Sequence, residues 1–406
     1  MPKSRRLVQC DVKLHKSAKD FNFFFSFSKV CCIIKPCEVI YLSQNKRTSH
    51  VKPKAKRKYR GFAIFGTVFL SVIGVVCIAL SGLLWYFQYN RSSALDALTD
   101  ADLGIKDNNN LSDKVINIAL FGIDARNLHA SRANSDSIMI LSIDSAHKKI
   151  KMTSVMRDSL VPIEGRGARK INAAYAYGGP ELAIKTLNQS FNLNIRDYAT
   201  VNFSGMADII EAMGGIEVEL TEAERQDANV HLRWMAIESG LKNDQIKSAG
   251  KQTLNGIQAV AFARIRHVRT INGVNDDYGR TDRQRYVMEQ LFNKAMAMGK
   301  SKYPSVIKAL LPHMETSMSY SDILELAGFL TGNTQFEQMR MPESHKMQIS
   351  TKDYPSSLGS VVYYNLEYAT NMLHAFIYDD IKQADYVAAN PPVTTPWYTN
   401  WAKTNT

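Results

Sequence analysis

VINIALFGI, residues 115–123, is the stretch that decides the fold. It is apolar and rich in β-branched residues, and it ends at a turn in GIDAR, which predicts a strand buried in a sheet. Two similar stretches follow, SIMILSI at residues 137–143 and IKMTSVM at residues 150–156. The apolar stretches between residues 115 and 156 therefore predict three strands in succession.

Further along the chain, helical and extended patterns alternate. Pro180 near the start of one helical segment and the Gly214–Gly215 pair after another mark helix ends. The alternation predicts an α/β sandwich with a central sheet. The expected helices are 181–191, 205–213, 255–266, 281–298 and 322–330, and the further strands are 198–203 and 216–220.

A run of 26 residues without a charge, Phe62–Phe87, precedes this body. A helix of about 20 apolar residues spans a bilayer core, so the run is long enough to do so. It is too long for an ordinary core helix or for the apolar part of a cleaved signal peptide. Lysines and arginines precede it, and Trp85, Tyr86 and Tyr89 lie at its far end, which predicts a cytoplasmic N-terminus. The expected order is a basic cytoplasmic tail (1–60), a transmembrane signal-anchor helix (61–87), a linker (88–112) and a body outside the cell membrane.

The formal net charge of +12 belongs to the tail. Residues 1–60 hold 16 basic and 3 acidic residues, whereas the rest of the chain holds 34 basic and 35 acidic ones. This charge therefore indicates orientation in the membrane and does not predict a nucleic-acid partner for the body. All five cysteines lie in the tail or the span, so the body has no thiol that could mispair in an oxidising space.

Charged residues fall where the three expected strands end. Asp124 follows the first strand, Asp136 lies at the mouth of the second, and Arg157–Asp158 closes the third. The ends of strands form the usual ligand-binding edge of an α/β sheet. A single aspartate after a strand is commonly a turn residue, but three charged ends in succession favour a site.

A run of arginines follows in ARIRHVR and DDYGRTDRQR, at 264, 266, 269, 280, 283 and 285. On a helix, Arg280, Arg283 and Gln284 are expected to share one face. Guanidinium groups bind phosphate oxygens in a bidentate fork, so the cluster suits a pyrophosphate. A salt-bridged helix surface is the alternative. Motifs for a phosphate loop, a serine nucleophile elbow or a zinc helix are absent from the sequence.

Seven segments in order make the body resemble the LytR-CpsA-Psr family of cell-envelope proteins. They are INIALFGIDAR, SDSIMILSID, SVMRDSLV, KINAAYAYGG, MGGIEVEL, AGKQTLNGIQAVAFARIR and DYGRTDRQR, which together cover about residues 113–300. The resemblance implies a three-layer α-β-α sandwich around a mostly mixed sheet, preceded by one transmembrane helix. It also implies a catalytic domain at 113–335 and a C-terminal extension at 336–406, part of which we expect to be disordered after about residue 390.

The resemblance further implies a phosphotransferase of the cell envelope. Members move a glycopolymer (wall teichoic acid, capsule or a related polysaccharide) from an undecaprenyl-pyrophosphate carrier to peptidoglycan, assisted by Mg²⁺ or Mn²⁺. The implied catalytic residues are Asp124, Asp136, Arg157 and Arg266, with Asp124 and Asp136 also near the metal. The implied pyrophosphate-binding residues are Arg157, Lys170, Arg264, Arg266, Arg280 and Gln284.

The sequence departs from the family pattern in three places. Met156 stands where proline is common, and Asn134 stands where an arginine is common, with Arg132 or Arg126 as possible substitutes. Extra residues, VRTINGVNDDY, separate Arg266 from Arg280.

Physically, fixed arginines and a divalent metal stabilise the charge that develops when a pyrophosphate is split. An aspartate either holds the metal or takes the proton from the attacking hydroxyl. The apolar faces of 205–213 and 287–298 are candidates for a lipid slot, although either is also an ordinary core face. Two rival hypotheses are a polyprenyl-phosphate-binding scaffold without turnover and a transcriptional attenuator.

Overall fold

A computed structural model describes residues 73–77, 91–106, 111–112, 114–125, 133–240, 242–329, 333–343 and 359–392. Of the expected transmembrane segment, only residues 73–77 are among these, and they are helical. Within the described ranges, no helix combines the length and the apolar character that crossing a bilayer requires. The tail (1–60) and the segment after residue 392 lie outside the described residues.

The body is built on a mixed six-stranded sheet in the order β10-β3-β2-β1-β6-β9. The first three strands form an antiparallel meander, while β6 joins β1 and β10 joins β3 in parallel. The predicted strands at 115–123, 137–143, 150–156 and 198–203 are confirmed as β1, β2, β3 and β6. The bounds are β1 Val115–Ile123, β2 Ser135–Asp144, β3 Lys149–Val155, β6 Asp197–Asn202, β9 Glu315–Thr316 and β10 Gln335–Met341.

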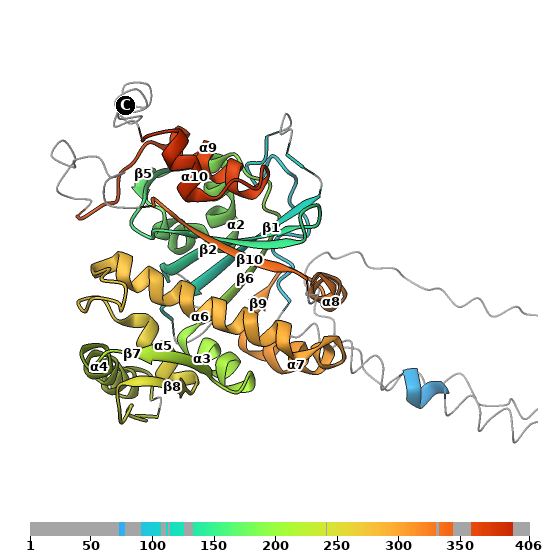
Figure 1. Cartoon of the computed structure of the whole chain (residues 1–406). Coiled ribbons are helices and arrows are strands. Elements are labelled where there is room, and N and C mark those ends of the chain that lie inside the picture. Colours follow the sequence, from blue (N-terminus) through green and yellow to red (C-terminus); the bar gives the residue numbers. More distant parts are fainter. Residues whose placement is uncertain are drawn as a thin grey trace, which may run out of the picture. The chain divides into compact units, whose positions relative to one another are not determined.

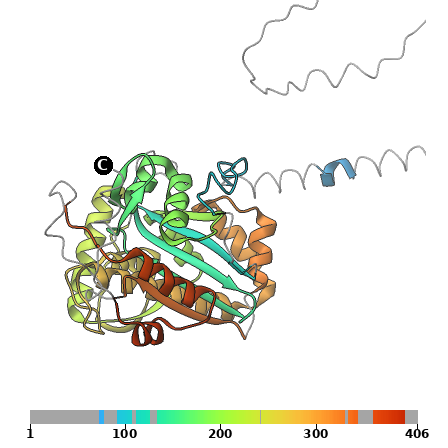
Figure 2. The same ribbon diagram turned by 90° about the horizontal axis from the view of Figure 1, so that it is seen from above.

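Helices cover both faces of this sheet (Figures 1 and 2). One face carries α2 (Asn172–Phe191), on which α9 (Leu366–Ile377) packs, and α10 (Gln383–Ala389) lies beside α9. The other face carries α3 (Phe203–Ala212) and α6 (Asp276–Met298). The remaining elements are β4 Leu160–Ile163, β5 Gly167–Lys170, β7 Ile216–Leu220, α4 Glu222–Ser239, β8 Gly250–Leu254, α5 Gly256–Arg264, η2 Lys300–Lys302, α7 Tyr303–Leu310, η3 Leu311–His313 and α8 Tyr320–Gly328.

The expected boundary between a domain at 113–335 and an extension at 336–406 runs through the sheet. β10 pairs with β3 along its whole length, and Leu373 and Phe376 of α9 are buried in the main core. The described part of this extension therefore completes the core. The sequence pattern did not reveal this strand because β10, QFEQMRM, is mostly polar and has two adjacent polar residues, Glu337 and Gln338, so it shows neither an apolar run nor a strict alternation.

The helix α4 was not predicted, because its sequence is mostly polar. Thr221 and Glu224 nevertheless form a capping box at its start, and that Thr-x-x-Glu spacing was a usable signal. With the antiparallel pair of β7 and β8, α3, α5 and α6, it encloses a second core. Two predicted helices also begin earlier than expected: α2 starts before Pro180 and kinks at Gly178–Gly179, and α6 starts at Asp276.

Candidate functional site

The predicted charged strand ends meet at one edge of the sheet. Ile123 at the end of β1 pairs with Ser135 at the start of β2 and with Asn202 at the end of β6. Asp124 and Asp136 each follow one of these paired residues, and Arg157 comes two residues after β3. The pairings of β2 with β1 and with β3 in the meander thus bring these charges together.

Asp136 and Arg157 form the first half of the site. Nη1 of Arg157 donates to Oδ1 of Asp136 at 2.5 Å. Asp158 lies 3.5 Å from Nε of Arg157 and accepts Nζ of Lys170 at 2.9 Å. Burial lowers the pKa of Arg157, but the carboxylates of Asp136 and Asp158 outweigh it and raise the pKa above its usual value. The guanidinium is therefore fixed in place by carboxylates on two sides.

Asp277 holds the second half, on the first turn of α6. Its Oδ1 lies 2.8 Å from Nη2 of Arg266 and 3.2 Å from Nη2 of Arg280. Burial lowers the pKa of Arg280 to about 10, and the positive charge of Arg157 contributes to the shift. Arg157 therefore lies close enough to Arg280 to affect its ionisation, so the two halves of the site are neighbours. Nε of Arg280 is buried and makes no hydrogen bond to any described residue. A buried donor of this kind is a place for an anionic ligand atom.

The local sequence explains how Arg264 reaches the site. Asn255 and Gln258 form a capping box that starts α5, and Arg264 is its last residue. A Cβ on Gly256 would come within 1.9 Å of the carbonyl oxygen of Ala207, so only glycine allows α5 to pack this closely on α3. The guanidinium of Arg264 consequently lies 4.2 Å from the ring centroid of Phe203.

Asp124 is exposed at the open side of the site. Partial desolvation raises the pKa of its carboxyl, Asp136 and Glu238 raise it further, and Arg264 and Arg157 oppose them. Asp124 and Asp136 are thus neighbouring carboxylates that repel each other. One or two carboxylates together with substrate phosphate oxygens are a common donor set for Mg²⁺, so these residues fit such an ion.

An apolar slot continues inward from the charged cluster. Its volume is about 260 Å³, and it lies between the sheet, α3, α5, α6 and the η3 region. Arg264 and Gln284 line it, so the slot meets the basic cluster directly. Both candidate slot faces from the sequence contribute, through Met206, Ile209 and Ile210 of α3 and Val287, Met288 and Leu291 of α6.

Some predicted residues lie elsewhere. Arg283 does not share the face of Arg280 and Gln284, because it turns to α4, where its Nη2 pairs with Oε1 of Glu224 at 2.9 Å; both residues are 2% exposed. Because both side chains are buried, Arg283 is not available to a ligand, and its ion pair with Glu224 links α6 to α4. Asn134 is exposed, and its two suggested substitutes, Arg126 and Arg132, lie outside the described residues.

Phe203 was not singled out from the sequence as a site residue. It was expected only as the end of a strand, and it is the first residue of α3. No motif indicates its contact with Arg264, because Phe203 and Arg264 are distant in the chain. Only the packing of α5 on α3 brings them together.

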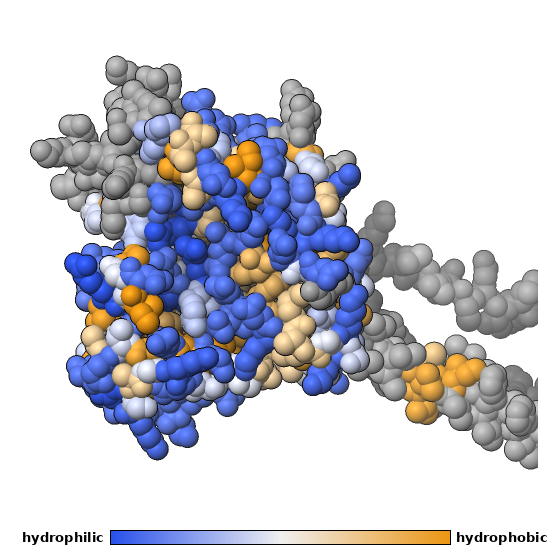
Figure 3. All heavy atoms as spheres, viewed as in Figure 1, coloured by the Kyte–Doolittle hydropathy of each residue, from blue (hydrophilic) through white to orange (hydrophobic). Residues whose placement is uncertain are grey.

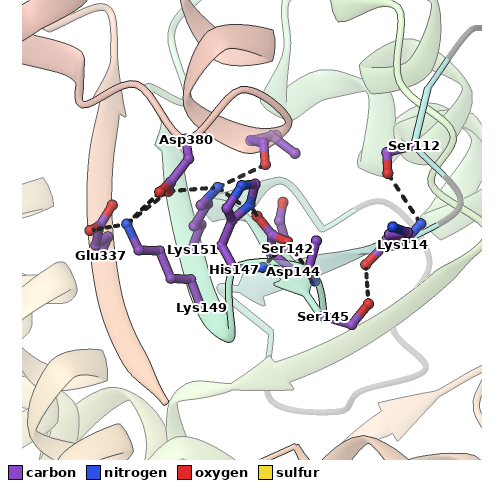
Figure 4. Close-up of polar contacts among 12 residues, drawn as sticks. Ser112, Lys114, Ser142, Asp144, Ser145, His147, Lys149, Lys151, Glu337 and Asp380 are labelled. Carbon is purple, nitrogen blue, oxygen red and sulfur yellow. Dashed lines mark hydrogen bonds and ion pairs between the residues drawn. The ribbon is translucent and has the colours of Figure 1, made fainter. Parts of the chain in front are cut away.

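A second charged cluster lies at the opposite edge of the sheet (Figure 4). Asp144, His147 and Asp380 lie close enough together to hold a metal ion. However, Nζ of Lys151 lies 2.8 Å from Asp144 and 3.2 Å from Asp380. The lysine occupies the carboxylate oxygens, so we assign this cluster a structural role.

The fold and the first site together define an α/β protein suited to an amphiphile with an anionic head and a long apolar tail. The LytR_cpsA_psr family model matches residues 84–367, and the chain belongs to this family, which confirms the resemblance.

Two relatives and one solved structure illustrate this membership. "Polyisoprenyl-teichoic acid--peptidoglycan teichoic acid transferase TagU" of Enterococcus faecalis is 29% identical over 273 residues, 66% of this chain and 83% of that protein. "Regulatory protein MsrR" of Staphylococcus aureus is 31% identical over 237 residues, 57% of this chain and 65% of that protein. The solved structure "TagT bound to LI-WTA" is 22% identical, with a TM-score of 0.51 over 65% of this chain and 91% of that one, so it shares the fold.

Proposed function

We propose that this chain is a membrane-anchored phosphotransferase that moves a glycopolymer from a polyprenyl-pyrophosphate carrier to peptidoglycan. The observation that carries the proposal is the junction of an apolar slot with a cluster of partly exposed arginines that carboxylates hold in place. The slot suits the prenyl tail, and the arginines suit the pyrophosphate. The name of the TagU relative supports teichoic acid as the polymer, within a wider class that includes capsule and related polysaccharides.

The proposed reaction transfers a phosphoryl-linked polymer. A hydroxyl oxygen of the acceptor attacks the phosphorus that bears the glycopolymer, the bond to the bridging oxygen breaks, and polyprenyl phosphate leaves. Negative charge grows on the leaving phosphate. Arg157, Arg266 and Arg280 are already oriented by Asp136 and Asp277, so they can stabilise this charge without reorganisation.

Asp124 and Asp136 are the residues that would hold Mg²⁺ or Mn²⁺. A bound ion would supply further positive charge to the pyrophosphate oxygens. Asp124 is the exposed member of the pair, so an acceptor hydroxyl can reach it, and it would serve as the proton acceptor when Asp136 alone holds the ion. We therefore assign the proton of the attacking hydroxyl to Asp124.

The location follows from the same proposal. A single-pass anchor at 61–87, with the N-terminus in the cytoplasm, would hold the body outside the cell, where a lipid-linked donor and peptidoglycan are found. The proposal includes no nucleic-acid partner. Because the body lies outside the cell in this topology, protease added outside intact cells should cleave the body and spare the tail.

The direct test is transfer of a labelled lipid-linked polymer by the purified full chain. Arg266→Ala and Asp136→Ala should each reduce transfer, because they remove a phosphate contact and release Arg157. Arg285→Ala is the control, since it also removes one arginine, but from the side of α6 that faces Asp282 and Gln338, outside the site.

Each outcome discriminates between hypotheses. Transfer that is unaffected by both site variants would remove the assignment of these residues. A co-purifying prenyl lipid without transfer under any divalent metal would favour the scaffold. A body that is protected from external protease would favour the attenuator.

A further inference from the structure

The chain enters the body at a defined corner. Arg91 bridges to Thr316 of β9, and its Nε donates to the carbonyl of Ser317 at 2.9 Å. The backbone N–H of Ser92 donates to the carbonyl of Thr316 at 2.8 Å. Four residues reach at most about 14 Å, so a span that ends at Phe87 would keep this corner within that distance of the bilayer surface.

The inner end of the apolar slot lies at the same corner. Leu310 at the end of α7 and Met314 after η3 line the slot, and Met314 directly precedes β9. Arg264 and Gln284 line the slot near the charged cluster. The slot therefore connects the charged cluster to the corner at which the chain enters.

The segment from the end of α6 through η3 is basic and partly apolar. Residues 290–314 contain four lysines and no aspartate or glutamate. Lys294 is engaged by the carbonyls of Met213 and Gly214. We define the α7 surface by its exposed residues Lys300, Lys302, Lys308, Ala309 and Pro312.

Apolar side chains adjoin these lysines. Figure 3 shows apolar residues gathered over the C-terminal half of α6, which leads into η2 and α7. Val306 and Leu310 of α7 are half-buried, while Tyr303 and Ile307 anchor the helix in a small core of its own. Lysines beside an apolar face are typical of segments that lie on a membrane surface.

We propose that the α7 surface docks on the anionic phospholipid surface of the membrane, with Lys300, Lys302 and Lys308 at the head groups. The end of the slot that is lined by Leu310 and Met314 then faces the bilayer. The tail of a lipid-linked donor can enter the slot there without crossing water. This inference rests on the proposed function and on the expected membrane span.

The test compares amide hydrogen exchange of residues 300–314 in the full chain, reconstituted in phosphatidylglycerol or in phosphatidylcholine nanodiscs. Exchange should be slower on the anionic lipid, and high salt should remove the difference. The variant Lys300→Glu, Lys302→Glu, Lys308→Glu should lose the protection. Each lysine near an anionic surface contributes about fivefold to binding, so the docking equilibrium constant should fall by at least about 100-fold when the three charges are reversed.

The matched control reverses three exposed lysines elsewhere, Lys242→Glu, Lys247→Glu and Lys251→Glu, and should keep the protection. Equal exchange on both lipids would overturn the proposal. Protection by a soluble polyanion on neutral lipid, equal to that on anionic lipid, would overturn it in favour of a polymer-binding surface.

A second measurement separates this inference from the proposed function. Transfer from a short-chain, water-soluble donor in detergent does not require docking, so all three proteins should perform it equally. Absence of that transfer in the unmodified chain would contradict the proposed function. The hydrogen-exchange measurement would then still decide, independently, whether the α7 surface docks on the membrane.

Discussion

The two ends of the central sheet both carry clustered charges, yet the clusters differ in how completely the protein satisfies them. At the Asp144 end, Lys151 is 0% exposed and Asp144 is 1% exposed, and each is bound by the other. Lys151 also donates to the carbonyl of Ile377, and Lys149 to both oxygens of Asp380 (Figure 4). At the Asp136 end, the ion pairs are partly exposed, and Arg280 keeps a buried donor without a hydrogen bond to the described residues.

The difference separates structural charge from functional charge. Buried charges that are fully paired within the protein have nothing left to offer a ligand. Charges that are oriented but incompletely paired keep donors for one, and here they adjoin an apolar slot. Composition alone does not distinguish the clusters, because both consist of aspartates and basic residues.

The largest expected effect is the loss of stability at the closed end. Lys151→Met would leave Asp144 buried without its cation, which should lower the free energy of unfolding by about 3–5 kcal/mol. Urea denaturation measures this change. Adding Asp144→Asn to the same protein should restore most of the loss, because no unpaired charge remains. A single variant that loses less than about 1 kcal/mol would break the comparison.

The next effect is on transfer at the open end. Arg280→Lys keeps the charge but removes the planar fork, so transfer should fall by about 100-fold, as when one preorganised donor is removed. Arg285→Lys, on the other side of α6, is the control. The melting temperatures of both variants should stay close to that of the unmodified chain. A kcat within twofold of the unmodified value would show that Arg280 is structural, like Lys151.

A smaller effect is expected in the slot. Ala263 is half-buried and lines it, so Ala263→Phe should displace about two methylenes of a prenyl tail and raise the KM for a long-chain donor about tenfold. The KM for a short-chain donor should not change. Ala297→Phe, on the exposed surface of α6, serves as the control. Equal effects on both donors would contradict a tail-binding role.

The smallest effect is a pH dependence of stability at the closed end. Burial would raise the pKa of Asp144, but the hydrogen bonds from Lys151 and His147 outweigh it and hold the pKa below its ordinary value. A depressed pKa contributes stability that is present above the unfolded-state value and is lost as pH falls through the folded value.

We therefore expect the unmodified chain to lose stability below about pH 4 more steeply than Asp144→Asn, by about 1.4 kcal/mol for each unit of depression. Denaturant unfolding at several pH values measures this slope. Identical slopes would mean that Asp144 is not ionised in the folded state.

Much of the fold was predictable because it depends on local pattern. The apolar runs of β1, β2 and β3 predicted that these strands are buried, as they are. The antiparallel order of the three strands then determines which strand ends lie next to one another. β10 and α4 were missed for a physical reason, since their stability comes from distant partners. β10 is held by β3, and α4 is held by the buried Arg283–Glu224 pair.

The candidate site was predictable to a similar degree. Residues at strand ends, such as Asp124, Asp136 and Arg157, follow from the sheet alone. The sequence could not distinguish Arg280, which faces the site, from Arg283, which does not. Two residues three positions apart on a helix lie on nearly the same face, and the spacing does not tell which neighbouring element each side chain contacts. The contact of Arg264 with Phe203 depends on how α5 packs on α3, which the sequence pattern does not encode.

The pairing of β10 with β3 has a consequence for how the protein is made. β3 emerges from the ribosome early, and its edge partner follows only after β4 to α8 have been synthesised. Until then β3 exposes an open hydrogen-bonding edge, which invites aggregation. A translation product that stops before Gln335 should thus remain unfolded and be degraded. The pairing of β10 thus comes late in synthesis, and it is the step that closes this edge of the sheet.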